Sequence, residues 1–238
     1  MKKIKIQGEI GWDVTAQEVE TDLLNANGDI EVEIDSPGGS VFEGVKIFNL
    51  LRNYKGGKVT IIINSIAASM GSYIAMAGDK IKVYDNSTFM IHNPWTIEVG
   101  DYRDFEKTAE TLKGLTKLLR NKYVEKTGKS EDEIKYLMNE ESWFFGEEIV
   151  KVGFANEVIK TNEDNDKQAL IALAKERFKS CVRKMKEAEE DKVKKEVAAL
   201  AKIVSEAQSQ IGEEEVKRKI EYEVAKAKLN LLKRSLNG

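Results

Sequence analysis

The stretch Ile66-Ala67-Ala68-Ser69-Met70-Gly71 decides how the rest of the chain is interpreted, because it places a hydroxyl among small apolar residues. The run before it, residues 58–64 (KVTIIIN), is continuous and β-branched, which is typical of a strand covered on both faces. The run after it, residues 72–78 (SYIAMAG), indicates a short buried helix. Ser69 is therefore predicted where strand meets helix, beside a free Met70 N–H that could bind an oxyanion.

Ser69 has two interpretations. It is either a small residue that lets the helix pack closely, or a nucleophile with a base in reach. His92 favours the second, because it is the only histidine in the chain and the only side chain whose ordinary pKa suits a base near neutral pH. The two prolines, Pro37 and Pro94, lie in the loops predicted to flank the serine, and the first of these loops, SPGG at residues 36–39, would expose backbone N–H groups.

Strands and helices alternate on both sides of this stretch, which predicts an α/β domain with a mainly parallel sheet. Strands are expected at residues 2–7, 30–35, 58–64, 81–84, 88–91 and 156–159, with a sharp turn at 36–40. Helices are expected from the capping box at Thr15 to about 25, at 41–54, 72–78, from 100 to about 126, from the capping box at Ser130 to about 139, and at 146–152.

The composition argues against a nucleic-acid-binding protein, a disulfide-bonded protein and a membrane protein. A net charge of −3, with Lys and Glu interleaved, gives no basic surface for nucleic acid. Cys181 is the only cysteine, so the chain has no internal disulfide and no cysteine-rich metal site. The N-terminus lacks the apolar core of a signal peptide, and the longest apolar run, residues 65–78, is too short to span a bilayer. These features predict a cytoplasmic protein with no membrane segment, and no metal or organic cofactor is expected.

The composition changes near residue 162, where a predicted catalytic-looking domain (1–162) gives way to a charged helical extension (163–238). From Asp166 no glycine or proline occurs until Gly212. Two helices of coiled-coil character broken at Gly212 are the simplest prediction, and a solvated charged tail of marginal helicity is the alternative. The apolar seam is formed by Val193, Val197, Leu200, Val204, Ala207 and Ile211, then by Val216, Ile220, Val224, Ala227 and Leu231.

Three motifs in order, SPGG (36–39), AASMG (67–71) and MIHNP (90–94), resemble the proteolytic subunit of the Clp protease and the ClpP-like phage prohead maturation proteases. The resemblance covers about residues 1–160. It implies a ClpP/crotonase-type fold, serine peptidase activity on protein or peptide substrates, and a homo-oligomer, with a ring as one form, in which the long helix after the histidine loop makes subunit contacts. It also implies that Ser69 is the nucleophile, His92 the general base, and the N–H groups of Gly39 and Met70 the oxyanion hole.

The acid of the implied triad is less well defined. Counting back from Gly153, Glu141 falls where the family has an aspartate, and Glu140 is one residue away. A glutamate can orient the histidine as an aspartate does, but its longer side chain requires a shifted backbone. For either residue, a solvated charge at a helix end is the alternative.

Several roles remain open at this point. The extension resembles in composition the scaffold segments fused to phage capsid proteases, which favours a prohead protease that cleaves scaffold and capsid proteins. The alternative is a Clp-like chambered peptidase fed by a separate ATPase unfoldase, since the chain has no GKT or GKS phosphate loop. Two alternatives of another class are a crotonase-type acyl-CoA enzyme and an inactive scaffold protein.

Overall fold

The structure is a computed structural model that describes residues 1–161, 167–208, 221–222 and 224–225. The chain divides into two compact units, Met1–Cys181 and Val182–Gly238. In the part of the chain that the structure describes, no helix is both long and apolar enough to cross a bilayer.

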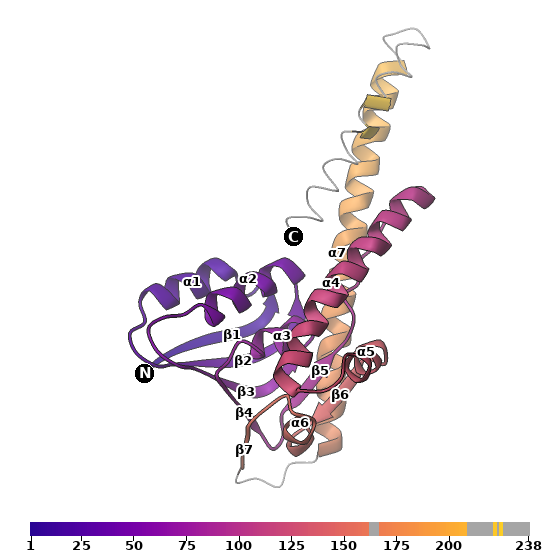
Figure 1. Ribbon diagram of the computed structural model, residues 1–238. Coiled ribbons are helices and arrows are strands. Elements are labelled where there is room, and N and C mark those ends of the chain that lie inside the picture. Colours follow the sequence, from indigo (N-terminus) through magenta and orange to yellow (C-terminus); the bar gives the residue numbers. More distant parts are fainter. Residues whose placement is uncertain (162–166, 209–220, 223, 226–238) are drawn as a thin grey trace. The chain divides into compact units, whose positions relative to one another are not determined.

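The first unit is built on one mixed seven-stranded sheet (Figure 1). Its main path has the order β1-β2-β3-β4-β7, and every pair along this path is parallel. β5 pairs in parallel with β3, and β6 pairs antiparallel with β5. The predicted α/β class with a mainly parallel sheet is confirmed. The strands are β1 (Lys2–Ile10), β2 (Ile30–Gly39), β3 (Val59–Ala68), β4 (Lys80–Tyr84), β5 (Thr88–Ile91), β6 (Ser142–Phe145) and β7 (Glu157–Ile159).

Several helices begin at capping residues of the sequence. Thr15 and Ser130 form the predicted capping boxes with Glu18 and Glu133, and Asp101 forms another with Asp104. The helices are α1 (Ala16–Leu24), α2 (Val41–Arg52), α3 (Met70–Ala75), α4 (Tyr102–Thr127), α5 (Glu131–Asn139), α6 (Glu147–Val152) and α7 (Lys167–Gln208).

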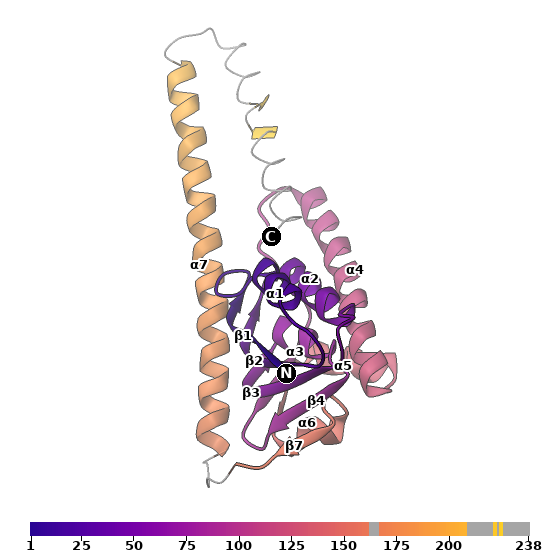
Figure 2. The same ribbon diagram turned by 90° about the vertical axis from the view of Figure 1, so that its left-hand side faces the viewer.

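The two faces of the sheet differ in chemistry. One face is apolar and is covered by helices that include α2, α3 and α4 (Figure 2), whose buried side chains join those of the strands in a single core. The other face is charged, with the Nζ atom of Lys3 2.8 Å from a carboxylate oxygen of Glu31 and 3.0 Å from one of Glu33. The expectation that residues 58–64 are covered on both faces is therefore wrong, because Thr60, Ile62 and Asn64 are only half buried.

β2 and β3 extend further than the sequence predicted. Residues 36–39 continue β2 instead of forming a sharp turn, because Gly38 and Gly39 pair with Glu9 and Ile10 of β1. β3 pairs with β4 up to Ile63 and then with β5 from Ile66. The carboxyl-terminal end of β3 thus lies between β2 and β5, a position in parallel sheets where ligands commonly bind.

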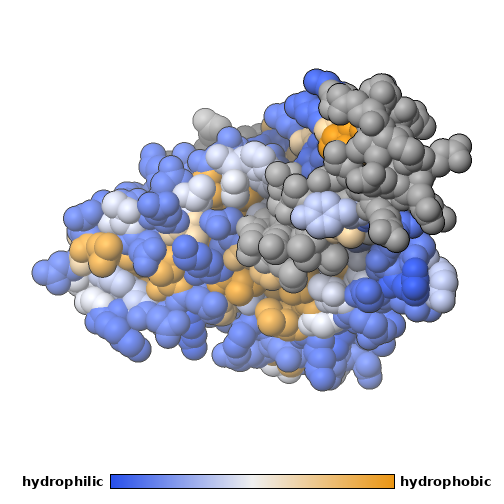
Figure 3. Space-filling view, turned by 90° about the horizontal axis from the view of Figure 1, so that it is seen from above, coloured by the Kyte–Doolittle hydropathy of each residue, from blue (hydrophilic) through white to orange (hydrophobic). Residues whose placement is uncertain are grey.

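Some apolar side chains of the first unit lie on its surface. Val99 and the α4 residues Tyr102, Phe105 and Leu118 are exposed. Figure 3 shows orange apolar patches among hydrophilic residues on the side of the molecule that carries α1 and α2. A groove of about 590 Å³ lies between these two helices, lined in part by Leu23, Leu24, Phe42, Val45 and Leu50.

The second unit contains the later part of α7, which is helical to Gln208 as predicted. Within it, Val197 is 59% exposed. The predicted break at Gly212 and the seam residues Ile211, Val216, Ile220, Ala227 and Leu231 lie outside the described residues, so the coiled coil stays a prediction.

Candidate active site

Ser69 occupies the predicted junction, one residue after β3 and one residue before α3. Its backbone N–H donates a hydrogen bond of 3.0 Å to the carbonyl of Met90 in β5. Its own carbonyl accepts hydrogen bonds from the Tyr73 N–H at 3.1 Å and from the Ser72 hydroxyl at 2.6 Å. These bonds fix the serine backbone from the neighbouring strand and from the helix that follows.

The backbone of Ser69 is strained. Its φ of 53° lies in a region that side chains disfavour, and among the described residues Glu141, with φ of 47°, is the only other non-glycine with a positive φ. Gly146 has nearly the same conformation as Ser69 before α6, but a glycine adopts it without cost. A serine in this conformation costs about 1–3 kcal/mol, and such strain is concentrated at functional sites.

His92 follows β5 and faces the serine. Its Nε2 atom lies 2.7 Å from Ser69 Oγ, which is hydrogen-bond distance. The side chain is 12% exposed, and burial lowers the pKa of His92 to about 4. The imidazole is therefore neutral at pH 7, and with its proton on Nδ1 the Nε2 atom can accept the serine proton.

Glu141 lies on the other side of the imidazole. Its Oε2 atom is 4.0 Å from His92 Nδ1, beyond hydrogen-bond distance, and its side chain is 50% exposed. Glu140 is the C-cap residue of α5 and, within the described residues, forms no ion pair with His92. Of the two acids considered from the sequence, the structure brings Glu141 to the histidine.

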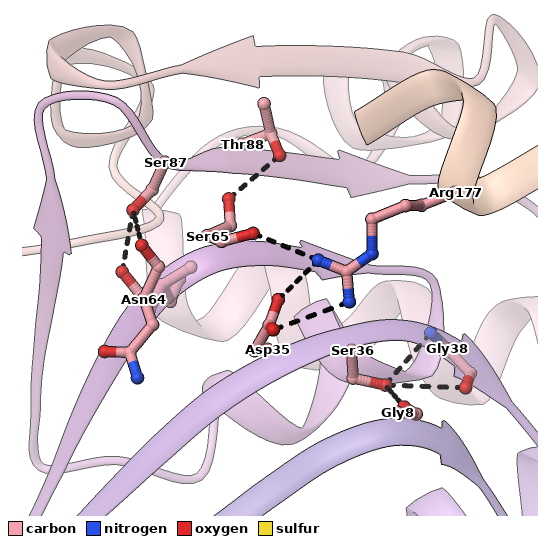
Figure 4. Close-up of polar contacts among 10 residues, drawn as sticks. Gly8, Asp35, Ser36, Gly38, Asn64, Ser65, Ser87, Thr88 and Arg177 are labelled. Atoms are coloured by element: carbon pink, nitrogen blue, oxygen red, sulfur yellow. Dashed lines mark hydrogen bonds and ion pairs between the residues drawn. The ribbon is translucent and has the colours of Figure 1, made fainter. Parts of the chain in front are cut away.

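Gly38 and Gly39 pass close to the serine and to β1. A Cβ atom on Gly38 would lie 2.6 Å from Ser69 Cβ, and one on Gly39 would lie 2.2 Å from the Ile10 carbonyl oxygen. The buried Ser36 hydroxyl donates to the Gly8 carbonyl at 2.6 Å and accepts from the Gly38 N–H at 3.1 Å (Figure 4). Met70, the other predicted oxyanion residue, is the first residue of α3, so its N–H has no acceptor within the helix.

The sequence did not single out the polar pair beneath the nucleophile. The hydroxyl groups of Ser72 and Tyr123 are 2.9 Å apart in the buried core. Because the single Ser72 proton goes to the Ser69 carbonyl, Tyr123 donates to Ser72. The three-residue spacing of Ser69 and Ser72 could have indicated that these two residues are neighbours on a helical turn. The contact with Tyr123 could not be predicted in this way, because Tyr123 lies in α4, much later in the chain.

Two aromatic residues, of which one contacts His92 and the other contacts the first, were also missed. The Phe178 ring of α7 meets the His92 ring edge-on, with centroids 5.5 Å apart, and its centroid is 5.7 Å from that of Trp143 in β6. Among the described residues, no group of three or more His, Cys, Asp or Glu side chains is placed to hold a metal ion.

A comparison with known protein families matches residues 2–162 to the family described as Clp protease, which is more than half of the chain. This match covers all the residues predicted for the site, from Gly39 to Glu141, and supports a serine peptidase. The matched region holds the mostly parallel sheet, and the whole of α7 follows it. The chain therefore belongs to the Clp protease family.

Proposed function

We propose that this chain hydrolyses peptide bonds by forming an acyl-enzyme on Ser69. The observation that carries the proposal is the 2.7 Å separation of Ser69 Oγ and His92 Nε2. As Oγ attacks the peptide carbonyl, Nε2 takes the hydroxyl proton and later returns it to the leaving amine. Water, deprotonated by the same nitrogen, then releases the acyl group and regenerates Ser69.

The N–H groups of Gly39 and Met70 would bind the oxyanion of the tetrahedral intermediate. Two observations support this role, the place of Met70 at the first position of α3 and the lack of room for a side chain at Gly39. Loss of one such donor costs about 2.7–4 kcal/mol in other enzymes. Glu141 would hold the Nδ1–H tautomer of His92 and stabilise the imidazolium when it forms.

Covalent labelling with a fluorophosphonate and hydrolysis of a short peptide test this mechanism. We expect Ser69→Ala to lose the label entirely, and both Ser69→Ala and His92→Ala to reduce hydrolysis by at least ~10³-fold while remaining folded. Ser205→Ala, at an exposed serine in the second unit, is the matched control and should behave as the wild type. A label retained in Ser69→Ala contradicts the proposal, and an unlabelled wild type would favour a crotonase-type or inactive scaffold protein.

We further propose that the chain acts as a phage prohead protease on scaffold and capsid proteins, with its own C-terminal extension as one substrate. Two features support this role. α7 is a long charged helix that begins after the matched residues 2–162, and exposed Tyr102, Phe105 and Leu118 on α4 offer an apolar contact to a second copy.

A time course of intact mass separates this role from its alternative. We expect the wild type to lose a segment C-terminal to about residue 160, and Ser69→Ala to stay full length under the same conditions. If both stay intact while Ser69 is labelled, a chambered peptidase that depends on a separate ATPase unfoldase is favoured instead.

A further inference from the structure

The first part of α7 presents an apolar stripe to the catalytic domain. Ala174, Phe178 and Cys181 are 6%, 7% and 6% exposed, although α7 is otherwise rich in charged residues. Their spacing of four and three residues puts them on one side of the helix. Residues 174–181, called the α7 segment below, belong to the same compact unit as the sheet.

The stripe is packed against the candidate base. The Phe178 ring lies edge-on to His92 and to Trp143, at centroid distances of 5.5 and 5.7 Å. Lys175, one turn earlier, places its Nζ atom 5.9 Å from the centre of the Trp143 ring. The α7 segment therefore contacts the imidazole itself, through a ring that is 7% exposed beside a histidine side chain that is 12% exposed.

Arg177 holds the segment to strands β2 and β3 of the sheet (Figure 4). Its Nη1 atom donates to Asp35 Oδ1 at 2.9 Å and to Ser65 Oγ at 3.2 Å, and its Nη2 atom lies 3.4 Å from Asp35 Oδ2. Asp35 is in β2 just before the glycines at 38–39, and Ser65 is in β3 four residues before Ser69. The helix thus contacts β2, which ends at the glycines 38–39, β3, which leads to the nucleophile, and the base His92.

The contact has the properties of one that can open. The ion pair is partly exposed, with 37% of the Arg177 side chain and 26% of the Asp35 side chain accessible, so water competes for both partners. The buried apolar side chains of the α7 segment are those of one aromatic residue, Phe178, and two small residues, Ala174 and Cys181.

We propose that the α7 segment masks the active site of its own chain and that substrate gains access when the segment withdraws. The surface formed by Asp35, Ser65, His92 and Trp143 is then a docking surface for a helix that presents an arginine followed by a phenylalanine. The inference rests on the proposed function, because masking has a consequence only if Ser69 and His92 react with a substrate.

The test compares rates of fluorophosphonate labelling at Ser69 in full-length proteins that remain folded. Arg177→Glu is expected to raise the labelling rate roughly fivefold, as fits the loss of one partly exposed ion pair. Lys179→Glu is the matched control, since its side chain is 68% exposed, and it should label like the wild type. Combining Arg177→Glu with Asp35→Arg restores the pair in reverse and should return the rate to the wild-type value.

Each other outcome counts against the proposal. A rate that is unchanged or lower in Arg177→Glu, with the wild type labelled at Ser69, overturns masking and leaves the proposed function standing. Such a result would mean that Arg177 and Phe178 stabilise the active site instead of masking it. Absence of label at Ser69 in all four proteins overturns the proposed function, and the masking role with it.

Discussion

The Glu141 carboxylate lies 4.0 Å from His92 Nδ1, whereas the Ser69 hydroxyl lies 2.7 Å from His92 Nε2. The histidine is therefore within hydrogen-bond distance of the nucleophile, whereas the acid lies beyond that distance. Glu141 also has a positive φ, so the backbone is strained where the acid must approach the imidazole.

This loose contact predicts a moderate effect of removing the acid. Glu141→Gln should lower kcat by about 10- to 100-fold, less than the ~10⁴-fold loss seen for a tightly bonded triad aspartate. Glu140→Gln is the adjacent control, and its kcat should stay within about twofold of the wild type. Peptide hydrolysis by both variants measures the difference, and a larger loss in Glu140→Gln would exchange the two roles.

The pH dependence of the reaction should report the buried imidazole. Because burial lowers the pKa of His92 to about 4, the base stays unprotonated well below the pH at which an exposed histidine gains its proton. We expect the rate of Ser69 labelling to be level from about pH 7 to about pH 5 and to halve near pH 4. A midpoint close to pH 6.5 would mean that His92 is solvated in the reacting protein.

The same depressed pKa links stability to pH. The unfolded chain binds a proton at His92 near pH 6.5, while the folded chain, with a pKa of about 4, does not. The free energy of unfolding should therefore be fully retained above pH 6.5 and fall by about 3 kcal/mol as the pH drops to 4.

The single histidine makes this linkage measurable. Denaturant unfolding of wild type and His92→Gln at several pH values gives the His92 contribution as the difference between the two curves, because the carboxylates titrate in both proteins. Parallel curves between pH 6.5 and pH 4 would show that the folded protein does not depress the pKa of His92.

The buried pair of Ser72 and Tyr123 should affect both stability and rate. Tyr123→Phe removes the donor to Ser72 and should cost about 1 kcal/mol of unfolding free energy. Ser72→Ala should also slow Ser69 labelling, because the Ser69 carbonyl loses the 2.6 Å bond that holds it in its strained conformation.

A double-mutant cycle separates this pair from independent packing effects. The two substitutions together should cost less than the sum of their separate effects. Tyr136→Phe, at a tyrosine 64% exposed, is the control and should change neither quantity. Additive costs with an unchanged labelling rate would show that the pair has no part in positioning Ser69.

The sequence predicted those parts of the fold that depend on local signals. Capping boxes at Thr15 and Ser130 placed two helix starts, and β-branched runs placed the central strands. Local signals failed at residues 36–39, where Pro37 and two glycines indicated a turn, because pairing with β1 holds this segment as strand. The antiparallel pairing of β6 with β5 was also missed, since partner choice for a short apolar run depends on the whole sheet.

The candidate site also contains residues that local signals predicted and residues that they did not. Ser69 and His92 could be proposed from residue type and from neighbouring elements. Helical periodicity shows that Ala174, Phe178 and Cys181 share a face, but it does not show what the face packs against. The contact of Phe178 with His92 is long-range, and only the folded chain reveals it.

The two-sided pairing of β5 also has a consequence for protein synthesis. The strand that precedes His92 is bonded to β3 on one edge and to β6 on the other, and β6 is translated only after α4 and α5. A nascent chain that ends within α4 already contains Ser69 and His92 but lacks the outer neighbour of β5. We therefore expect Ser69 and His92 to become competent only after β6 has emerged from the ribosome and paired with β5, so that the unfinished chain is protected from its own activity.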